Sequence, residues 1–206
     1  MTRLSKLFSA VLVCVLAGVI SADQAFSKII VREKTSYYPI KGTTGVELAE
    51  EMLRGGQKNI NLRHAIAATA ASYEIGDAEV KVINGRCKVT FVEVILDIEY
   101  TYPRWTNKSS GSRKLQSVWN QFFKELVRHE QTHGRIAKEG AKQLERELER
   151  ISGTVAFGCN DFGAFSSIRL NALGRQLKNR QLAFDRRENF RVSRISRLQT
   201  LLINAE

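Results

Sequence analysis

The sequence predicts an α+β protein, in which a small antiparallel sheet packs against a long helix and a second helix that returns antiparallel to it. Three observations support this class. Segments rich in β-branched and aromatic residues fill the first half of the chain. Apolar residues at helical spacing run from residue 115 to residue 151. A turn marked by Gly153 and Gly158 then separates this long helix from another helical pattern.

The first 22 residues have the features of a secretory signal peptide. Two basic residues precede an apolar run at residues 7–20, and Ala22 or Ser27 offers a small last residue before cleavage. The run is too short for a comfortable membrane-spanning helix. We therefore expect a periplasmic or secreted protein that has no transmembrane segment in its mature form. Residues 23–206 are expected to fold as a single domain.

Three segments of the first half are predicted to form the sheet. Each contains β-branched and aromatic residues and is bounded by turn residues. They cover residues 29–40, residues 65–75 together with 79–83, and residues 87–102. The pair Asn84-Gly85 is typical of a tight hairpin turn, and Pro103 is expected to end the last strand.

Helices are predicted in the rest of the chain. A short helix over residues 46–54 can be capped by Thr43 or Thr44 and is ended by two glycines. A serine of the preceding polar loop is expected to cap the long helix over residues 115–151. A second helical pattern covers residues 168–184, and the basic tail from residue 191 continues with more helix.

The long helix carries the motif His129-Glu130-Gln131-Thr132-His133, an H-E-x-x-H pattern. Its histidines are four residues apart, so both imidazoles lie on one face of the helix and can bind a single zinc ion. They interrupt the apolar stripe and are expected to face the interior. The alternative is a pair of buried histidines whose ring nitrogens are satisfied by hydrogen bonds. Burying two imidazoles costs free energy unless their nitrogens have partners, and a metal ion is such a partner for both. Glu130 can then act as a general base towards water at the metal.

A catalytic zinc ion usually has three protein ligands, and no extended motif marks the third one here. Glu139 stands where some metalloproteases place it, but in an unbroken helix Glu139 points about 80° away from His129. If the chain folds back, the returning helix brings Asp185 close to the histidines, so Asp185 is the predicted third ligand. An ordinary ion pair with a neighbouring arginine is its alternative role. The other candidates, in order, are Glu188, Asp161 and His64.

Two cysteines, Cys87 and Cys159, remain after the predicted signal peptide is removed. An even number of cysteines in an exported chain favours a disulfide, which would close a long loop and stabilise the fold by roughly 4 kcal/mol. Two free buried thiols are the alternative. The bond is predicted to tie the turn before the returning helix to the sheet.

The chain is strongly basic, with a formal net charge of +11. The excess is concentrated from residue 169 onward, where arginines far outnumber acidic residues. Such a stretch attracts an acidic envelope polymer, although a solvated helix face is the simpler interpretation. Aromatic residues are sparse among the arginines, which argues against a stacking surface for single strands, so no specific nucleic acid is expected.

Several further motifs are similar to those of a known family. They are Tyr38-x-x-x-Gly42-Thr43-Thr44-x-x-Glu47-Leu48, Gly85-Arg86-Cys87-x-Val89, Tyr102-Pro103-x-Trp105, Trp119 ahead of the H-E-x-x-H motif, and Cys159. Over nearly all of its predicted mature length the chain resembles DUF922, a family of predicted secreted bacterial zinc-dependent proteases. The resemblance implies a zinc site at His129 and His133, with Glu130 as the catalytic carboxylate.

The chain departs from that family near its C-terminus. Members often end with Tyr-Asp-x-x-Thr-x-His-Gly, whereas this chain has Phe184-Asp185-Arg186-Arg187-Glu188-Asn189-Phe190-Arg191. The aspartate is kept, but the threonine, histidine and glycine are absent. If that histidine is a ligand in relatives, this chain would bind zinc more weakly, use Glu188 instead, or be inactive.

The residues and the resemblance together predict an exported zinc metallopeptidase that acts on peptide or protein substrates. His129, His133 and Asp185 would hold the zinc ion, and Glu130 would take a proton from water. Candidates for the group that stabilises the oxyanion are Tyr73, Tyr100 and Tyr102. The alternative is a non-catalytic basic envelope protein with a structural or degenerate zinc site, which binds acidic polymers or a protein partner through its arginine-rich half.

Overall fold

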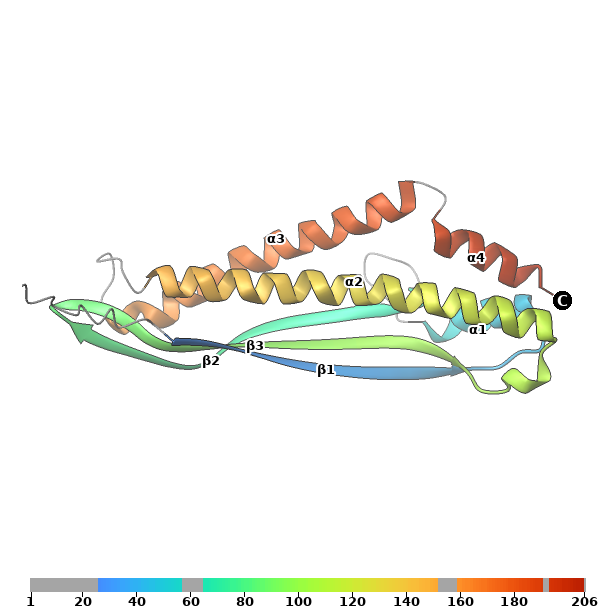
Figure 1. The fold of residues 1–206 in the computed structure, drawn as a ribbon, viewed down its shortest axis with the longest axis horizontal. Helices are drawn as coiled ribbons and strands as arrows, with labels where there is room; N and C mark the ends of the chain where they lie inside the picture. Colours follow the sequence, from blue (N-terminus) through green and yellow to red (C-terminus); the bar gives the residue numbers. More distant parts are fainter. Residues whose placement is uncertain (1–25, 57–64, 152–158, 191–192, 206) are drawn as a thin grey trace, which may run out of the picture.

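The computed structural model describes residues 26–56, 65–151, 159–190 and 193–205, which form three strands and four α-helices together with two short 3-10 helices. The predicted α+β class is confirmed. The predicted signal peptide, His64 and the predicted turn at residues 153–158 lie outside the described residues. Figure 1 shows an elongated arrangement in which one long helix follows the length of the sheet.

Strands β1 (Phe26–Ile40), β2 (Ala68–Ile83) and β3 (Arg86–Trp105) form one sheet in the order β1-β3-β2. β2 and β3 are antiparallel, and Asn84 and Gly85 between them both have positive φ, as the predicted hairpin requires. β1 is parallel to β3, so the sheet is mixed and not wholly antiparallel as expected. The path of the chain explains this arrangement. β2 begins at the end of the sheet where β1 stops and runs in the opposite direction. β3 reverses direction again and lies between β1 and β2, so it is parallel to β1.

β3 is longer than the sequence predicts. It continues past Pro103, which stays in register with Tyr38 of β1, and ends at Trp105. The pairing with β2 begins only at Ala68 and Thr101, so a proline at position 103 removes no hydrogen bond on that side. The two predicted pieces of β2 are one strand, interrupted by register shifts.

Helix α2 (Arg113–Ile151) is the predicted long helix and lies along the inner face of the sheet (Figure 1). It begins after a serine cap, because Ser112 Oγ accepts a hydrogen bond of 3.0 Å from the backbone N–H of Leu115. Its apolar stripe is buried in a common core with β3. Fully buried members of this core include Leu115, Phe122, Leu144 and Leu148 of α2 and Val92, Val94 and Leu96 of β3.

Helix α3 (Phe162–Phe190) returns antiparallel to α2, as predicted. It begins beside the sheet and crosses α2, so that its later turns lie on the side of α2 away from the sheet (Figure 1). The short 3-10 helix η2 (Cys159–Asp161) precedes it. The predicted disulfide joins Cys87, at the start of β3, to Cys159. The beginning of α3 is therefore fastened to the sheet by a covalent bond.

Two short helices pack together at the other end of the molecule. Helix α1 (Gly45–Gly55) begins at Thr44, which forms a capping box with Glu47, and helix α4 (Arg194–Ile203) begins at Ser193. Their buried side chains are Leu48, Met52, Leu198 and Leu202. Within the described ranges, no helix is both long enough and apolar enough to cross a bilayer.

The outer face of the sheet is polar, unlike the face that α2 covers. Basic residues of β1 pair across the strands with acidic residues of β3. These pairs are Lys28 with Glu93, Arg32 with Asp97, and Lys34 with Glu99. Such exposed pairs contribute little stability each, but they keep this face soluble and its register defined.

Candidate metal centre

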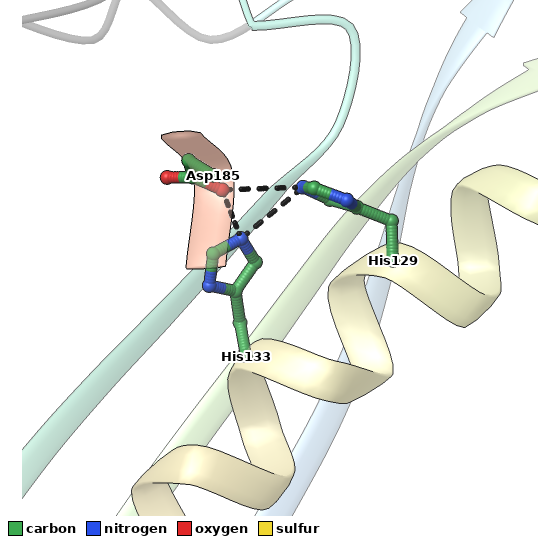
Figure 2. Close-up of side chains that lie close together, drawn as sticks. All are labelled: His129, His133 and Asp185. Atoms are coloured by element: carbon green, nitrogen blue, oxygen red, sulfur yellow. Dashed lines mark hydrogen bonds and ion pairs between the residues drawn. The ribbon is translucent and has the colours of Figure 1, made fainter. Parts of the chain in front are cut away.

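Three side chains from two helices meet at one point between α2 and α3 (Figure 2). They are the residues that the sequence analysis named: His129 and His133 from α2, and Asp185 from α3. The two Nε2 atoms are 3.2 Å apart, and Asp185 Oδ1 lies 3.0 Å from Nε2 of His133 and 3.4 Å from Nε2 of His129. In the part of the chain that the structure describes, no other group of His, Cys, Asp and Glu side chains is arranged to hold a metal ion.

The triangle formed by these three atoms has the size of a zinc site. Ligand distances of about 2.0–2.2 Å and tetrahedral angles place two ligand atoms about 3.3 Å apart. The observed separations of 3.0, 3.2 and 3.4 Å lie around this value. Two imidazoles and one carboxylate also form a donor set that suits zinc. The residues present therefore fit a zinc ion.

His133 is held in the orientation that metal binding needs. Its Nδ1 lies 2.5 Å from Oε1 of Gln181, and Nε2 of Gln181 donates a hydrogen bond of 3.1 Å to the backbone carbonyl of His133. The second bond fixes which end of the amide faces the ring. Nδ1 therefore donates to Gln181, and Nε2 keeps its lone pair for a metal. Gln181, one helical turn before Asp185, is not among the residues predicted from the sequence, because only its contact with His133 marks it out.

Phe184 packs against both imidazole rings. Its ring centroid lies 4.9 Å from that of His129 and 5.0 Å from that of His133. The Phe184 side chain is itself buried. Its apolar ring therefore shields one side of the metal group from water and restricts the rotation of both histidines.

Glu130 is buried, and its carboxyl group is bonded to β2. Thr69 Oγ1 donates a hydrogen bond of 2.7 Å to Glu130 Oε2. Burial raises the pKa of the Glu130 carboxyl, and the Thr69 hydrogen bond and the nearby histidines offset part of this effect. A carboxylate with a raised pKa is a better proton acceptor near neutral pH, as a general base requires.

The electrostatics of the metal group favour an ionised aspartate. Burial alone would raise the pKa of Asp185, but hydrogen bonds with His129 and His133 outweigh it and hold the pKa of this carboxyl well below its usual range. Burial alone would lower the pKa of His133, yet its contacts with Asp185 and Gln181 raise that pKa overall. Asp185 is thus a carboxylate at neutral pH, the form that binds a cation.

Glu188, the first alternative for the third ligand, lies behind His129. Its Oε2 is 3.8 Å from Nδ1 of His129, the ring nitrogen that does not belong to the metal group. The same oxygen accepts a hydrogen bond of 2.8 Å from Nη2 of Arg128. In this structure Asp185, and not Glu188, completes the triangle.

The remaining alternatives for the third ligand are placed elsewhere. Glu139 forms an ion pair with Arg180 of α3, so it is a surface charge as expected. Asp161 lies in η2, before the first residue of α3, which puts it roughly 36 Å along the helix from Asp185.

Two of the three tyrosines proposed as oxyanion stabilisers form hydrogen bonds within the fold. Tyr73 donates to the carbonyl of Ala137 at 2.7 Å, and Tyr100 donates to Glu33 Oε1 at 3.0 Å. Burial, reinforced by Glu33, raises the pKa of Tyr100 to about 12. Tyr102 is buried and stacks on Tyr100. These contacts support a role in packing α2 onto the sheet.

Gly134, which directly follows the H-E-x-x-H motif, allows α2 to approach β3 closely. A Cβ atom at this position would lie 1.9 Å from the hydroxyl oxygen of Tyr100. Glu33 accepts the hydrogen bond from that hydroxyl and forms an ion pair of 2.8 Å with Lys138, one turn further along α2. The contacts of Gly134 and Lys138 with the sheet thus fix the depth at which α2 presents His133.

A groove of about 560 Å³ opens between β2 and α3 beside the metal group. Thr69, which contacts Glu130, and Gln181, which contacts His133, both line it. β2 is an edge strand, so its backbone faces this side without a partner strand in the described sheet. Lys178 supplies the only charge among the lining residues, and Gly174 has open space where a side chain would start.

The fold and the metal group together define an α+β protein whose H-E-x-x-H helix and returning helix share one candidate zinc centre. The chain belongs to the family described as "Bacterial protein of unknown function (DUF922)", whose model matches residues 35–191. This match confirms the family assignment made from the sequence, and it spans all three residues of the metal group. Neither the curated proteins nor the solved structures contain a match to the chain.

Proposed function

We propose that the protein is an exported zinc-dependent metallopeptidase that hydrolyses peptide bonds. The observation that carries this proposal is the meeting of His129, His133 and Asp185, with ligand atoms within 3.4 Å of one another, on the helix turn that also bears the buried Glu130. Three protein ligands and an adjacent carboxylate are the set that zinc-assisted hydrolysis uses. When bound, zinc would act as a Lewis acid on the scissile carbonyl and would make water a stronger nucleophile near neutral pH.

Each residue of the centre has a distinct task in this proposal. The three members of the metal group hold the ion, and Gln181 orients His133. Glu130 takes the proton from the attacking water. The hydrogen bond from Thr69 to Oε2 of Glu130 holds the carboxyl group in place. The raised pKa of the carboxyl lets it retain the proton and deliver it to the leaving nitrogen.

The groove between β2 and α3 is the proposed path for the substrate. Thr69 and Gln181 line it, so a peptide in the groove arrives on the side of the centre where Glu130 lies. An extended peptide can also hydrogen-bond to the free backbone edge of β2, which would align its carbonyl groups. The proposed substrates are therefore peptide segments in an extended conformation. The disulfide supports action in the periplasm or outside the cell, where such bonds persist.

Metal analysis and a peptide-cleavage assay on matched variants test the proposal. Wild-type protein is expected to bind about one zinc ion per chain and to cleave members of a broad peptide library. His129→Ala should lose both properties. Glu130→Gln should retain zinc but lose cleavage by roughly 100-fold or more, because the proton acceptor is gone.

The exposed carboxylate of Glu139 on the same helix provides the control. Glu139→Gln removes a negative charge from α2 without touching the metal group, so zinc content and cleavage should both stay at the wild-type level. Zinc binding without cleavage of any peptide by wild-type protein would refute the peptidase proposal.

A second groove favours the alternative of a binding protein for acidic polymers. It measures about 500 Å³, lies between α2 and α3, and is lined by Ile136, Ala183 and three arginines. Arg180 is paired with Glu139, while Arg186 and Arg187 carry further positive charge into the groove. If this groove defines the function, an acidic polymer should bind wild-type protein with steep salt dependence, and Arg186→Gln with Arg187→Gln should abolish that binding.

A further inference from the structure

His129 has a buried ring nitrogen without a hydrogen-bond partner. Its Nε2 belongs to the metal group, whereas its Nδ1 is shielded from solvent and makes no hydrogen bond within the described residues. His133 differs, because its Nδ1 is satisfied by Gln181. A neutral histidine that binds a metal through Nε2 carries its proton on Nδ1, and a buried N–H without an acceptor is costly. The metal-bound state therefore needs an acceptor behind His129.

The carboxylate of Glu188 faces that nitrogen from α3. The distance of 3.8 Å from Oε2 to Nδ1 exceeds a hydrogen bond by about 1 Å. A small rotation of the glutamate side chain covers this gap. The Glu188 side chain is 28% exposed, so its carboxylate is partly withdrawn from water and available to the ring.

Arg128 holds the same carboxylate oxygen. Its Nη2 donates to Glu188 Oε2 at 2.8 Å, and its Nε donates to Glu125 Oε1 at 2.7 Å. Glu125 is buried, and its other oxygen lies 3.6 Å from Nε of Arg194 at the start of α4. An arginine bonded on both sides keeps its geometry better than one in a single surface pair. These ion pairs thus connect α4, α2 and α3 and end at Glu188, beside Nδ1 of His129.

We propose that Glu188 is the outer partner of His129, and that Arg128 keeps the glutamate in place. Glu188 Oε2 accepts the hydrogen bond from Nδ1–H while Nε2 binds the metal, so Glu188 is a positioning residue and not a ligand. The inference rests on the zinc centre of the proposed function.

Zinc affinity of the full chain, measured by competition with a chelating dye, tests this role. Glu188→Ala should raise the zinc Kd about 10- to 100-fold, the usual effect of losing such a partner. Glu188→Gln should have a smaller effect, because its amide oxygen still accepts a hydrogen bond. Glu139→Gln is the matched control: it also removes a carboxylate from an ion pair between α2 and α3, and its Kd should stay within about twofold of wild type.

X-ray absorption at the zinc edge separates a positioning residue from a ligand. Glu188→Ala should keep the wild-type number of protein ligands, whereas Asp185→Asn should alter the coordination shell. In zinc-loaded protein, the Nδ1–H proton signal of His129 should move upfield in Glu188→Ala as the hydrogen bond is lost. Circular dichroism of the metal-free variants controls for folding.

An unchanged Kd in Glu188→Ala, or the loss of a ligand in that variant, would overturn the inference. Absence of zinc binding by wild-type protein would overturn both this inference and the proposed function. Zinc-loaded wild-type protein that cleaves no peptide, combined with a raised Kd in Glu188→Ala, would overturn the peptidase proposal alone.

Discussion

Helices α2 and α3 hold the same candidate metal group in different ways. On α2 the two histidines lie within a stripe of buried residues that continues on both sides, from Leu126 to Ala137 and beyond. α3 instead leaves Ile168 65% exposed and Leu182 42% exposed, and polar bridges to α2 contribute much of its attachment. The helix that is packed against the sheet thus supplies the motif, whereas the more exposed helix supplies one ligand and the residues that orient the histidines.

Truncating one side chain on each helix should show the difference most strongly. Phe122→Ala removes a fully buried ring from α2 and should lower the free energy of unfolding by about 3–5 kcal/mol. Ile168→Ala on α3 should change it by no more than about 0.5 kcal/mol, because that side chain is 65% exposed and lies largely in water. Urea unfolding of both variants checks this. Similar losses for the two would mean that α3 is as tightly packed as α2.

Removing the disulfide that fastens α3 to the sheet should lower the free energy of unfolding by nearly as much. The bond between Cys87 and Cys159 joins residues 72 positions apart, and loss of such a constraint on the unfolded chain corresponds to about 4 kcal/mol. Cys87→Ser with Cys159→Ser should therefore be less stable than wild type by this amount in urea. Reduced wild-type protein should match the double variant, and a difference below about 1 kcal/mol would contradict the expectation.

The close contact between α2 and β3 predicts that a glycine-to-alanine substitution within α2 lowers the stability of the protein instead of raising it. Alanine normally stabilises a helix interior relative to glycine by up to about 1 kcal/mol. Gly134→Ala should instead destabilise the protein by about 1–3 kcal/mol, because its Cβ would overlap the hydroxyl of Tyr100. Adding Tyr100→Phe should restore part of the loss in thermal unfolding. Gly163→Ala on α3, where the Cβ meets nothing within 4 Å, is the control that should not destabilise.

The smallest expected effect concerns the groove on the α3 side. Gly174→Phe places a ring in the groove at a position with open space for its Cβ, so the fold should tolerate it. Peptide cleavage should fall about tenfold or more, because the ring occupies the proposed substrate path, while zinc affinity stays unchanged. Gly163→Phe adds the same ring about three turns earlier on α3, at a glycine that does not line the groove, and should cleave at the wild-type rate. Equal rates for the two variants would remove the groove from the substrate path.

The sequence predicts α2 well because one repeated signal determines it. The spacing of its apolar residues predicts the helix, and a serine before them predicts where the helix begins. Because His129 and His133 occupy positions within the apolar stripe, the sequence also predicts that they face the interior. Asp185 could be placed from helix length alone, since an antiparallel return brings it to the depth of the motif. The same reasoning applies to the hairpin, where Asn84 and Gly85 carry the required positive φ.

Features that depend on tertiary contacts were not predictable in this way. The parallel pairing of β1 follows from the order in which the strands enter the sheet, and no periodicity encodes that order. In the sequence, Gln181 is one of many polar residues of a helix, and only its contact with His133 in the folded protein shows its role. The sequence suggests Glu188 as a ligand but not as a hydrogen-bond partner of Nδ1, because the side of the His129 ring that it faces depends on the rotation of α3 about its axis.

The bond between Cys87 and Cys159 also bears on when the centre becomes complete. Two of its three donor groups are built into a single helix turn, and the third arrives from a segment whose first turn is fastened by that bond. Thiols stay reduced in the cytosol and pair in oxidising compartments. If the centre binds zinc as proposed, the third donor of a newly made chain would be fixed in place only after this bond has formed, so oxidation would precede tight metal binding.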